Sequence, residues 1–75
     1  MKITFDRIAD AAYIQIQNEI RRGGVANTYA CDPAEAGGMI FLDFDSEGRL
    51  LGIEVLGATK LMPLEVLETA IDITR

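Results

Sequence analysis

The chain has 75 residues, 49% of them hydrophobic, a composition typical of folded globular domains and not of disordered chains. Its formal net charge is −5 and its seven lysines and arginines are scattered, which argues against the clustered basic surface that binds nucleic-acid phosphates. It has one cysteine, Cys31, and no histidine, which excludes an internal disulfide, a Ser–His–Asp or Cys–His catalytic arrangement and, for practical purposes, a structural zinc site.

One domain spanning residues 1–75 is predicted, because no linker, repeat or low-complexity tract interrupts the chain. A domain this short buries only about 60% of the surface that its unfolded chain exposes. Self-association is therefore the expected additional support. The opening residues, MKITFDRIADAAYIQ, carry charges that a signal peptide lacks, and no stretch approaches the roughly 18 apolar residues of a membrane span. We expect a cytoplasmic protein that does not bind membranes.

The N-terminal part of the chain predicts a β-hairpin. KITF at residues 2–5 and AAYIQIQ at residues 11–17 both alternate apolar and polar side chains, which is the period-two pattern of half-buried strands. In the second segment Tyr13 lies on the face opposite Ala12. Residues 18–24, NEIRRGG, end this strand with two glycines.

The middle of the chain predicts three more strands. VANTYAC at residues 25–31 is the weakest, and DPAEAGG at residues 32–38 is predicted to be a loop because of its proline and paired glycines. MIFLDF at residues 39–44 and RLLGIEVL at residues 49–56 flank the turn DSEG at residues 45–48. A four-residue turn predicts a hairpin in which every inward apolar side chain lies on one face.

That predicted register sets three specific pairs. It places Phe44 opposite Arg49, Asp43 opposite Leu50, and Phe41 opposite Gly52. Gly52 is then a structural residue whose bare backbone the Phe41 ring covers.

The C-terminal segment changes to helical spacing. In PLEVLETAIDI, residues 63–73, the apolar residues Leu64, Leu67 and Ile71 recur at i, i+3 and i+7, and Pro63 suits a first helical turn. The elements together predict an α+β fold, a small antiparallel β-meander sheet of four to five strands with one C-terminal helix.

The stretch DFDSEGRLLGIE raises the question of a calcium site. Its residues Asp43, Asp45, Glu47, Gly48 and Glu54 have the spacing of an EF-hand loop. Its flanks are predicted strands, however, whereas an EF-hand needs two helices to bring the ligands together. The predicted register separates the first and last carboxylates by four residues, roughly 13 Å. We therefore predict no metal site, and assign Asp45 as a turn-opening acceptor and Gly48 as a positive-φ turn residue.

The outer face of the predicted hairpin is partly apolar. Phe41, Leu50 and Leu56 share that side, and one short helix covers only one face of a sheet. We predict that these three residues, together with Tyr13, form an interface with a second subunit or another protein.

Other chemically capable residues have simpler structural interpretations. Asp6 and Asp10 flank a short connection, where each can cap a turn by accepting backbone N–H groups, although paired carboxylates can also act as acid and base. Cys31 lacks neighbouring cations in sequence and is expected to be inert. Tyr13 and Tyr29 are expected at a sheet edge or an interface rather than in a pocket. No catalytic residue and no cofactor are predicted.

Two stretches resemble a known family. FDRIADAAYIQI at residues 5–16 and DFDSEGRLLGIEVLGATK at residues 43–60 resemble domain of unknown function 2283, a family of small, mostly bacterial proteins. The matching positions are Asp6, Asp10, Ala11, Tyr13, Asp43, Gly48, Gly52, Ile53 and Glu54. The resemblance implies a small antiparallel sheet domain with no established catalytic residue. Some members lie beside toxin genes, which implies a toxin–antitoxin role.

The leading hypothesis from the sequence is a non-enzymatic protein-interaction module that acts as a homodimer and binds another protein, such as a toxin. Nucleic acid and membranes are not expected partners. The alternative is a small-molecule or ion-binding protein that uses the acidic hairpin residues Asp43, Asp45 and Glu54, or the two tyrosines.

Overall fold

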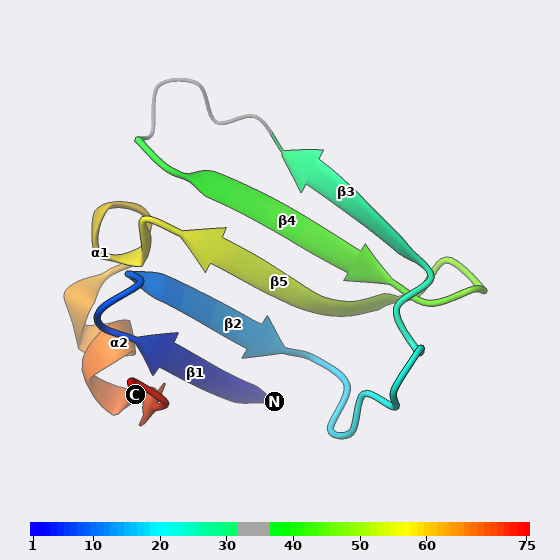
Figure 1. Cartoon of the computed structure of the whole chain (residues 1–75), viewed down its shortest axis with the longest axis horizontal. Helices are drawn as coiled ribbons and strands as arrows, with labels where there is room; N and C mark the ends of the chain where they lie inside the picture. The colour runs from blue at the N-terminus through cyan, green and yellow to red at the C-terminus, as the bar shows by residue number, and fades with distance from the viewer. Residues whose placement is uncertain (32–36) are drawn as a thin grey trace.

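A computed structural model describes residues 1–31 and 37–75, so the predicted loop at residues 32–38 falls mostly outside the described residues. The described residues form one six-stranded sheet with two short helices (Figure 1). In chain order the elements are β1 (Lys2–Asp6), β2 (Ala11–Gln15), β3 (Asn27–Cys31), β4 (Met39–Phe44), β5 (Leu50–Leu56), α1 (Ala58–Leu61), α2 (Leu64–Thr69) and β6 (Ile71–Asp72).

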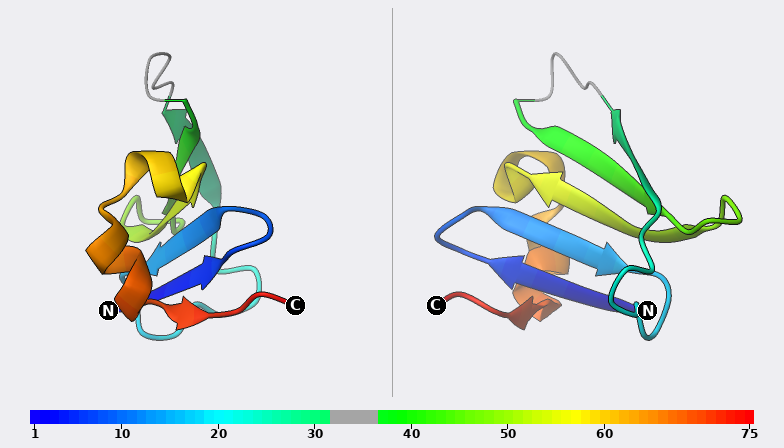
Figure 2. Two further views of the ribbon diagram at one scale, coloured as in Figure 1. Left: turned by 90° about the vertical axis from the view of Figure 1, so that its left-hand side faces the viewer. Right: turned by 45° about the vertical axis from the view of Figure 1, so that its right-hand side comes forward.

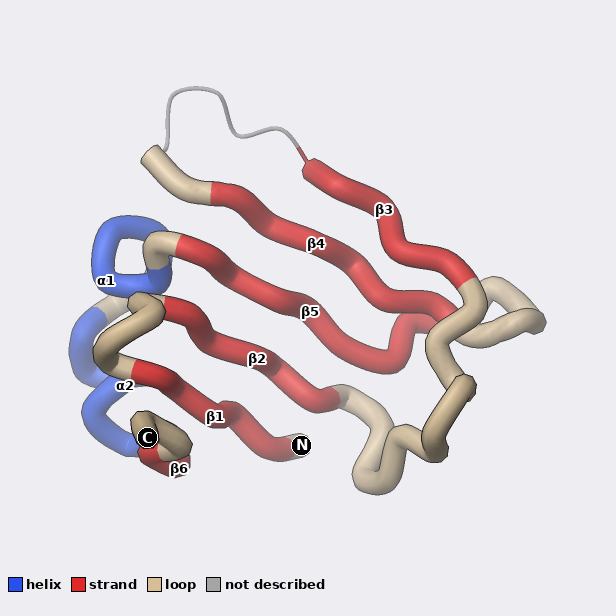
Figure 3. Tube along the Cα trace, viewed as in Figure 1, coloured by secondary structure: helices blue, strands red, loops and turns tan. Residues whose placement is uncertain are grey.

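The sheet is larger than the predicted meander and is mixed. Its strand order is β3-β4-β5-β2-β1-β6, in which all neighbours are antiparallel except β1 and β6, which are parallel (Figure 3). The chain leaves β2, crosses to the far edge to form β3, and returns so that β5 lies beside β2. The predicted meander is therefore wrong: β5, the strand with the most buried residues, takes a central place where both of its long edges are paired.

The single helix predicted over residues 63–73 is correct only for residues 64–69. The chain instead forms α1, a second short helix α2, and the two-residue strand β6. Pro63, which has no N–H group, separates the two helices, and Ala70 after α2 has extended backbone angles of φ −69° and ψ 154°. Ile71, predicted to be the last apolar residue of the helix, instead pairs with Thr4 of β1.

The core lies between the helices and one face of the sheet. A cross-strand row of Phe5, Ala12 and Val55 spans β1, β2 and β5, and Leu67 of α2 and Ala58 of α1 pack against it. Both helices lie on this face (Figure 2). The sequence pattern places Phe41 and Leu56 on the opposite, outer face, and this assignment is confirmed. Ala12 is only 2% exposed, and the larger side chains of Phe5, Val55 and Leu67 surround it in the core.

The β4–β5 hairpin is correct as a prediction, but its register is not. The Asp45 N–H donates to the Arg49 carbonyl over 2.9 Å, so the connection has three residues, with Gly48 at φ 79°. A further irregularity follows, since Phe44 pairs with Leu50 but Asp43 pairs with Gly52. Together, the shorter connection and this irregularity move β5 by two residues along β4 relative to the predicted register. Each side chain therefore stays on its predicted face of the sheet, but every residue of β4 faces a different residue of β5.

Among residues 1–31 and 37–75, no helix combines the length and the apolar character needed to cross a membrane.

Candidate functional site

The helix-free face of the sheet carries most of the candidate residues. Because Phe5, Ala12 and Val55 point toward the helices, their neighbours along each strand point to the other face, here called the bare face. The strand register arranges them in two neighbouring cross-strand rows: Thr4, Tyr13, Glu54, Phe41 and Ala30 in one, and Lys2, Gln15, Gly52, Asp43 and Thr28 in the other.

Three side chains form a hydrogen-bond network across this face. The Tyr13 hydroxyl on β2 donates to Asp43 Oδ2 on β4 over 2.9 Å. The Thr28 hydroxyl on β3 donates to Asp43 Oδ1 over 2.8 Å. Both carboxylate oxygens of Asp43 therefore have partners, and the network connects strands that are separated in the sheet by β5.

The network exists because Gly52 has no side chain. A Cβ at this position would overlap the hydroxyl and the adjoining ring carbons of Tyr13, so the ring lies directly over the glycine backbone. The prediction that Phe41 covers Gly52 is therefore wrong. The register pairs Phe41 with Glu54, and Tyr13 reaches diagonally into the neighbouring row to cover the glycine.

The environment of Tyr13 favours its protonated form. Burial, the hydrogen bond to Asp43 and the negative charges of Asp43 and Glu54 raise the pKa of Tyr13 to about 12. At neutral pH the hydroxyl is therefore a hydrogen-bond donor and is neither a nucleophile nor a base. The arrangement positions strands; it does not activate an oxygen.

The acidic turn residues have structural roles. Asp45 Oδ1 accepts the N–H groups of Glu47 and Arg49, each over 2.9 Å, and Gly48 has positive φ. Both predicted turn roles are thus confirmed.

The predicted separation of Asp43 and Glu54 is wrong. The two residues are diagonal neighbours across β4 and β5, for which Cα distances of about 7–8 Å are usual. Within the described ranges no three acidic or cysteine side chains are grouped as metal ligands would be.

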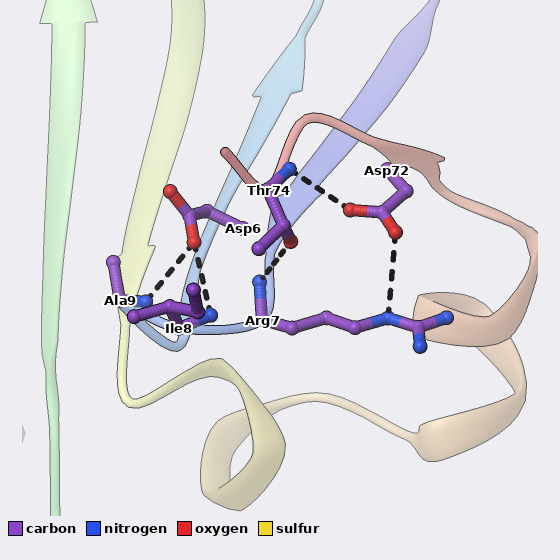
Figure 4. Close-up of polar contacts among 6 residues, drawn as sticks. All are labelled: Asp6, Arg7, Ile8, Ala9, Asp72 and Thr74. Carbon is purple, nitrogen blue, oxygen red and sulfur yellow. Dashed lines mark hydrogen bonds and ion pairs between the residues drawn. The ribbon is translucent and has the colours of Figure 1, made fainter.

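Asp6 caps the turn between β1 and β2. Its Oδ1 atom accepts the N–H groups of Ile8 and Ala9, each over 3.0 Å (Figure 4). The capping role predicted for this residue is confirmed, and the carboxylate is held within its own turn.

Asp10 caps a helix that lies far along the sequence. Its backbone is left-handed, with φ 52°, and its carbonyl accepts the N–H groups of Gly57 and Ala58, each over 2.9 Å. Its carboxylate accepts both the N–H and the hydroxyl of Thr59, over 3.0 and 2.8 Å. These bonds satisfy the unpaired N–H groups at the start of α1. The sequence gives no local sign of this cap, because the partners are 49 residues apart.

The predicted interface residues do not all come together. Phe41 and Leu56 share the bare face, and Met39, which is 45% exposed, pairs with Leu56. We call Met39, Phe41 and Leu56 the apolar patch. Leu50 lies beyond the register shift at the far end of the hairpin, and the Tyr13 hydroxyl belongs to the polar network.

The two tyrosines lie on opposite faces and do not form one pocket. Tyr29 pairs with Leu42, which pairs with Ile53, so this row belongs to the helix side of the sheet. Tyr29 is 63% exposed on the edge strand. Cys31, two residues further on, is a half-buried free thiol.

The chain matches the model of a known family. The model of a family described as protein of unknown function (DUF2283) matches residues 2–58, which include both resembling stretches almost completely. The comparisons with curated proteins and with solved structures found no match. Because the family model covers most of the 75 residues, the chain belongs to the family of proteins of unknown function DUF2283.

Proposed function

We propose that the chain is a non-enzymatic protein-interaction module that acts in the cytoplasm as a homo-oligomer and holds a second protein on the bare face of its sheet. The observation that carries this proposal is the one-sided cover of the sheet. Both helices pack on one face, and no described helix covers the other, which carries the apolar patch.

The surroundings of the apolar patch suit protein contact. Ala30 pairs with Phe41 and Ala11 pairs with Leu56, so small side chains border the larger apolar ones. Flat apolar surface with a polar border is the usual anatomy of a protein interface. The polar row beside it, with Asp43 and Thr28, supplies the border.

The charge of the chain suggests the chemistry of the partner. A net charge of −5 favours association with a basic protein through complementary fields. A basic toxin is one such partner, in keeping with the toxin–antitoxin role that the family resemblance implies.

The carboxylates support this proposal over the ion-binding alternative. Both oxygens of Asp43 and the Oδ1 atom of Asp45 already accept hydrogen bonds from the protein. These bonds already stabilise the carboxylate charges, so an ion would compete with the protein's own donors for them.

The experiment is a pull-down from native lysate, read by mass spectrometry, with the wild type and two variants. Phe41→Glu places a charge in the apolar patch, whereas Gln17→Glu adds the same charge at an exposed residue outside it. We expect one stoichiometric protein to be retained by the wild type and by Gln17→Glu and to be lost with Phe41→Glu. If the three samples retain the same proteins, the bare face is not the binding surface.

A further inference from the structure

The two edges of the sheet differ in how they are protected. At one edge, β6 has only two residues, and Asp72 within it lies 3.7 Å from the Arg7 guanidinium (Figure 4). The N–H of Arg7 donates to the Thr74 hydroxyl over 2.7 Å, and the N–H of Ile73 donates to the Phe5 carbonyl. A short, charged strand is a poor template for a further strand.

The β3 edge has none of these protections. It is five residues long, Asn27–Cys31, and contains no charged residue and no proline. Four of the five residues are exposed, and among the described strands only β4 pairs with β3. Alternate N–H and C=O groups of such a strand point away from the sheet, where they can pair with another strand.

We propose that β3 pairs antiparallel with β3 of a second copy of the chain, so that two sheets become one continuous sheet. This inference rests on the homo-oligomer of the proposed function and assigns its contact surface. A second copy suits this edge because the strand is neutral. Although each chain has a net charge of −5, no like charges meet between two β3 strands.

The length of β3 sets the register. Full overlap of two five-residue strands about a twofold axis places Tyr29 opposite Tyr29 of the second copy. It places Thr28 opposite Ala30 and Asn27 opposite Cys31. Aromatic cross-strand pairs stabilise such ladders, and the exposed Tyr29 ring gains a partner that it lacks in one chain.

The same axis brings the bare faces of the two copies to one side of the joined sheet. Ala30 of β3 borders Phe41 of the apolar patch, so both patches flank the junction. Dimer formation would therefore double the surface that we assign to the protein partner.

Light scattering across micromolar concentrations tests the contact. Tyr29→Lys places two lysines opposite each other, and we expect the dimer dissociation constant to rise by about tenfold or more, since like charges directly opposite destabilise strand pairing. Ile71→Lys is the matched control, because Ile71 is similarly exposed, at 52%, on the protected edge. We expect this control to remain dimeric, and circular dichroism verifies that each variant is folded.

Disulfide trapping tests the register. With Cys31→Ser as background, we expect Tyr29→Cys to form a covalent dimer under mild oxidation and Ile71→Cys to form none. Two facing residues have the Cα separation that a disulfide needs. In the wild type, the two Cys31 residues lie four residues apart across the junction, roughly 13 Å, and should not link.

The possible failures are distinct. A monomeric wild type, a dimer unaffected by Tyr29→Lys, or trapping through Cys31 but not through position 29 overturns the β3 junction. If the dimer is lost only with Phe41→Glu, the copies join through the bare face. The β3 inference is then wrong while the interaction-module proposal stands. A monomeric wild type also removes the homo-oligomer from the proposed function. The protein-binding part of the proposed function fails only if Phe41→Glu leaves the retained partner unchanged.

Discussion

The two faces of one sheet are stabilised by different physics. On the helix side, Phe5, Ala12 and Val55 form a row that Leu67 covers, and the stabilisation comes from burial of apolar surface. On the bare face the strands are connected by hydrogen bonds to Asp43. The comparison shows that the sizes of the side chains determine how the core packs on the helix side. On the bare face, the Tyr13 ring can reach Asp43 only because Gly52 has no side chain.

This contrast also separates stability from function. The helix-side row is covered by the protein's own helices. Among the described residues no buried side-chain polar atom on either face lacks a hydrogen-bond partner, so the polar row can remain in water. In the apolar patch beside that row, Met39 is exposed and Phe41 and Leu56 are half-buried. Substitutions can therefore test each face independently.

Leu67→Ala should have the largest effect. The side chain is 6% exposed, and its loss leaves a cavity over Phe5 and Ala12, so we expect the free energy of unfolding to fall by about 3 kcal/mol. Leu64→Ala is the control in the same helix, because Leu64 is 59% exposed, and its expected change is within about 0.5 kcal/mol. Urea unfolding followed by circular dichroism gives both values. Equal losses would mean that α2 does not close the core.

Gly52→Ala should destabilise next most strongly. The new Cβ would overlap the Tyr13 hydroxyl and ring, and we expect a loss of about 1–3 kcal/mol despite the better strand propensity of alanine. A double-mutant cycle with Tyr13→Ser identifies the cause. Without the ring, the alanine should cost much less. If its cost stays the same in both backgrounds, the bare face is not organised around this contact.

The strands were the part of the fold that the sequence could predict. Period-two alternation gave residues 39–44 correctly and placed the other four predicted strands to within two residues at each end, but it did not predict β6. It also gave the correct faces, because a register shift of two preserves alternation. Sheet order was not predictable, since the pairing of β2 with β5 depends on competition among strands of similar character and not on local pattern.

The helix error has a physical cause. The spacing of Leu64, Leu67 and Ile71 is helical, but Ile71 is adjacent to the unpaired edge of β1 and is β-branched, so strand pairing replaces the last helical turn. For the candidate site, the turn roles of Asp45 and Gly48 followed from local chemistry. The Tyr13–Asp43 bond could not be found, because the predicted register put Leu50 opposite Asp43.

The bond between Tyr13 and Asp43 should give a smaller, pH-dependent effect. At neutral pH Tyr13→Phe removes one hydrogen bond, and we expect a loss of about 0.5–1.5 kcal/mol. The folded-state pKa of Tyr13, about 12, lies above its ordinary value of 10.0. The stability that this protonated group contributes is therefore complete below pH 10 and is lost as pH rises toward 12.

Urea unfolding of wild type and Tyr13→Phe at several pH values checks this prediction. The two chains share every other titrating group, so their difference in unfolding free energy isolates Tyr13. The difference should be constant from pH 7 to about 9 and should shrink above pH 10. A difference that grows with pH would contradict a protonated donor at this position.

Calcium should have the smallest effect, with no change in melting temperature at millimolar concentration. Calcium takes six to eight oxygen ligands, but both oxygens of Asp43 and the Oδ1 atom of Asp45 accept hydrogen bonds that hold the hairpin and the bare-face network. An ion would compete with these donors, and within the described residues no three acidic side chains are grouped to supply its remaining ligands. Thermal unfolding in calcium, with magnesium at equal ionic strength as the control, measures the response. A calcium-specific rise of several degrees, abolished by Asp43→Asn, would show that the bare face binds ions and would reverse its assignment as a hydrogen-bonded surface.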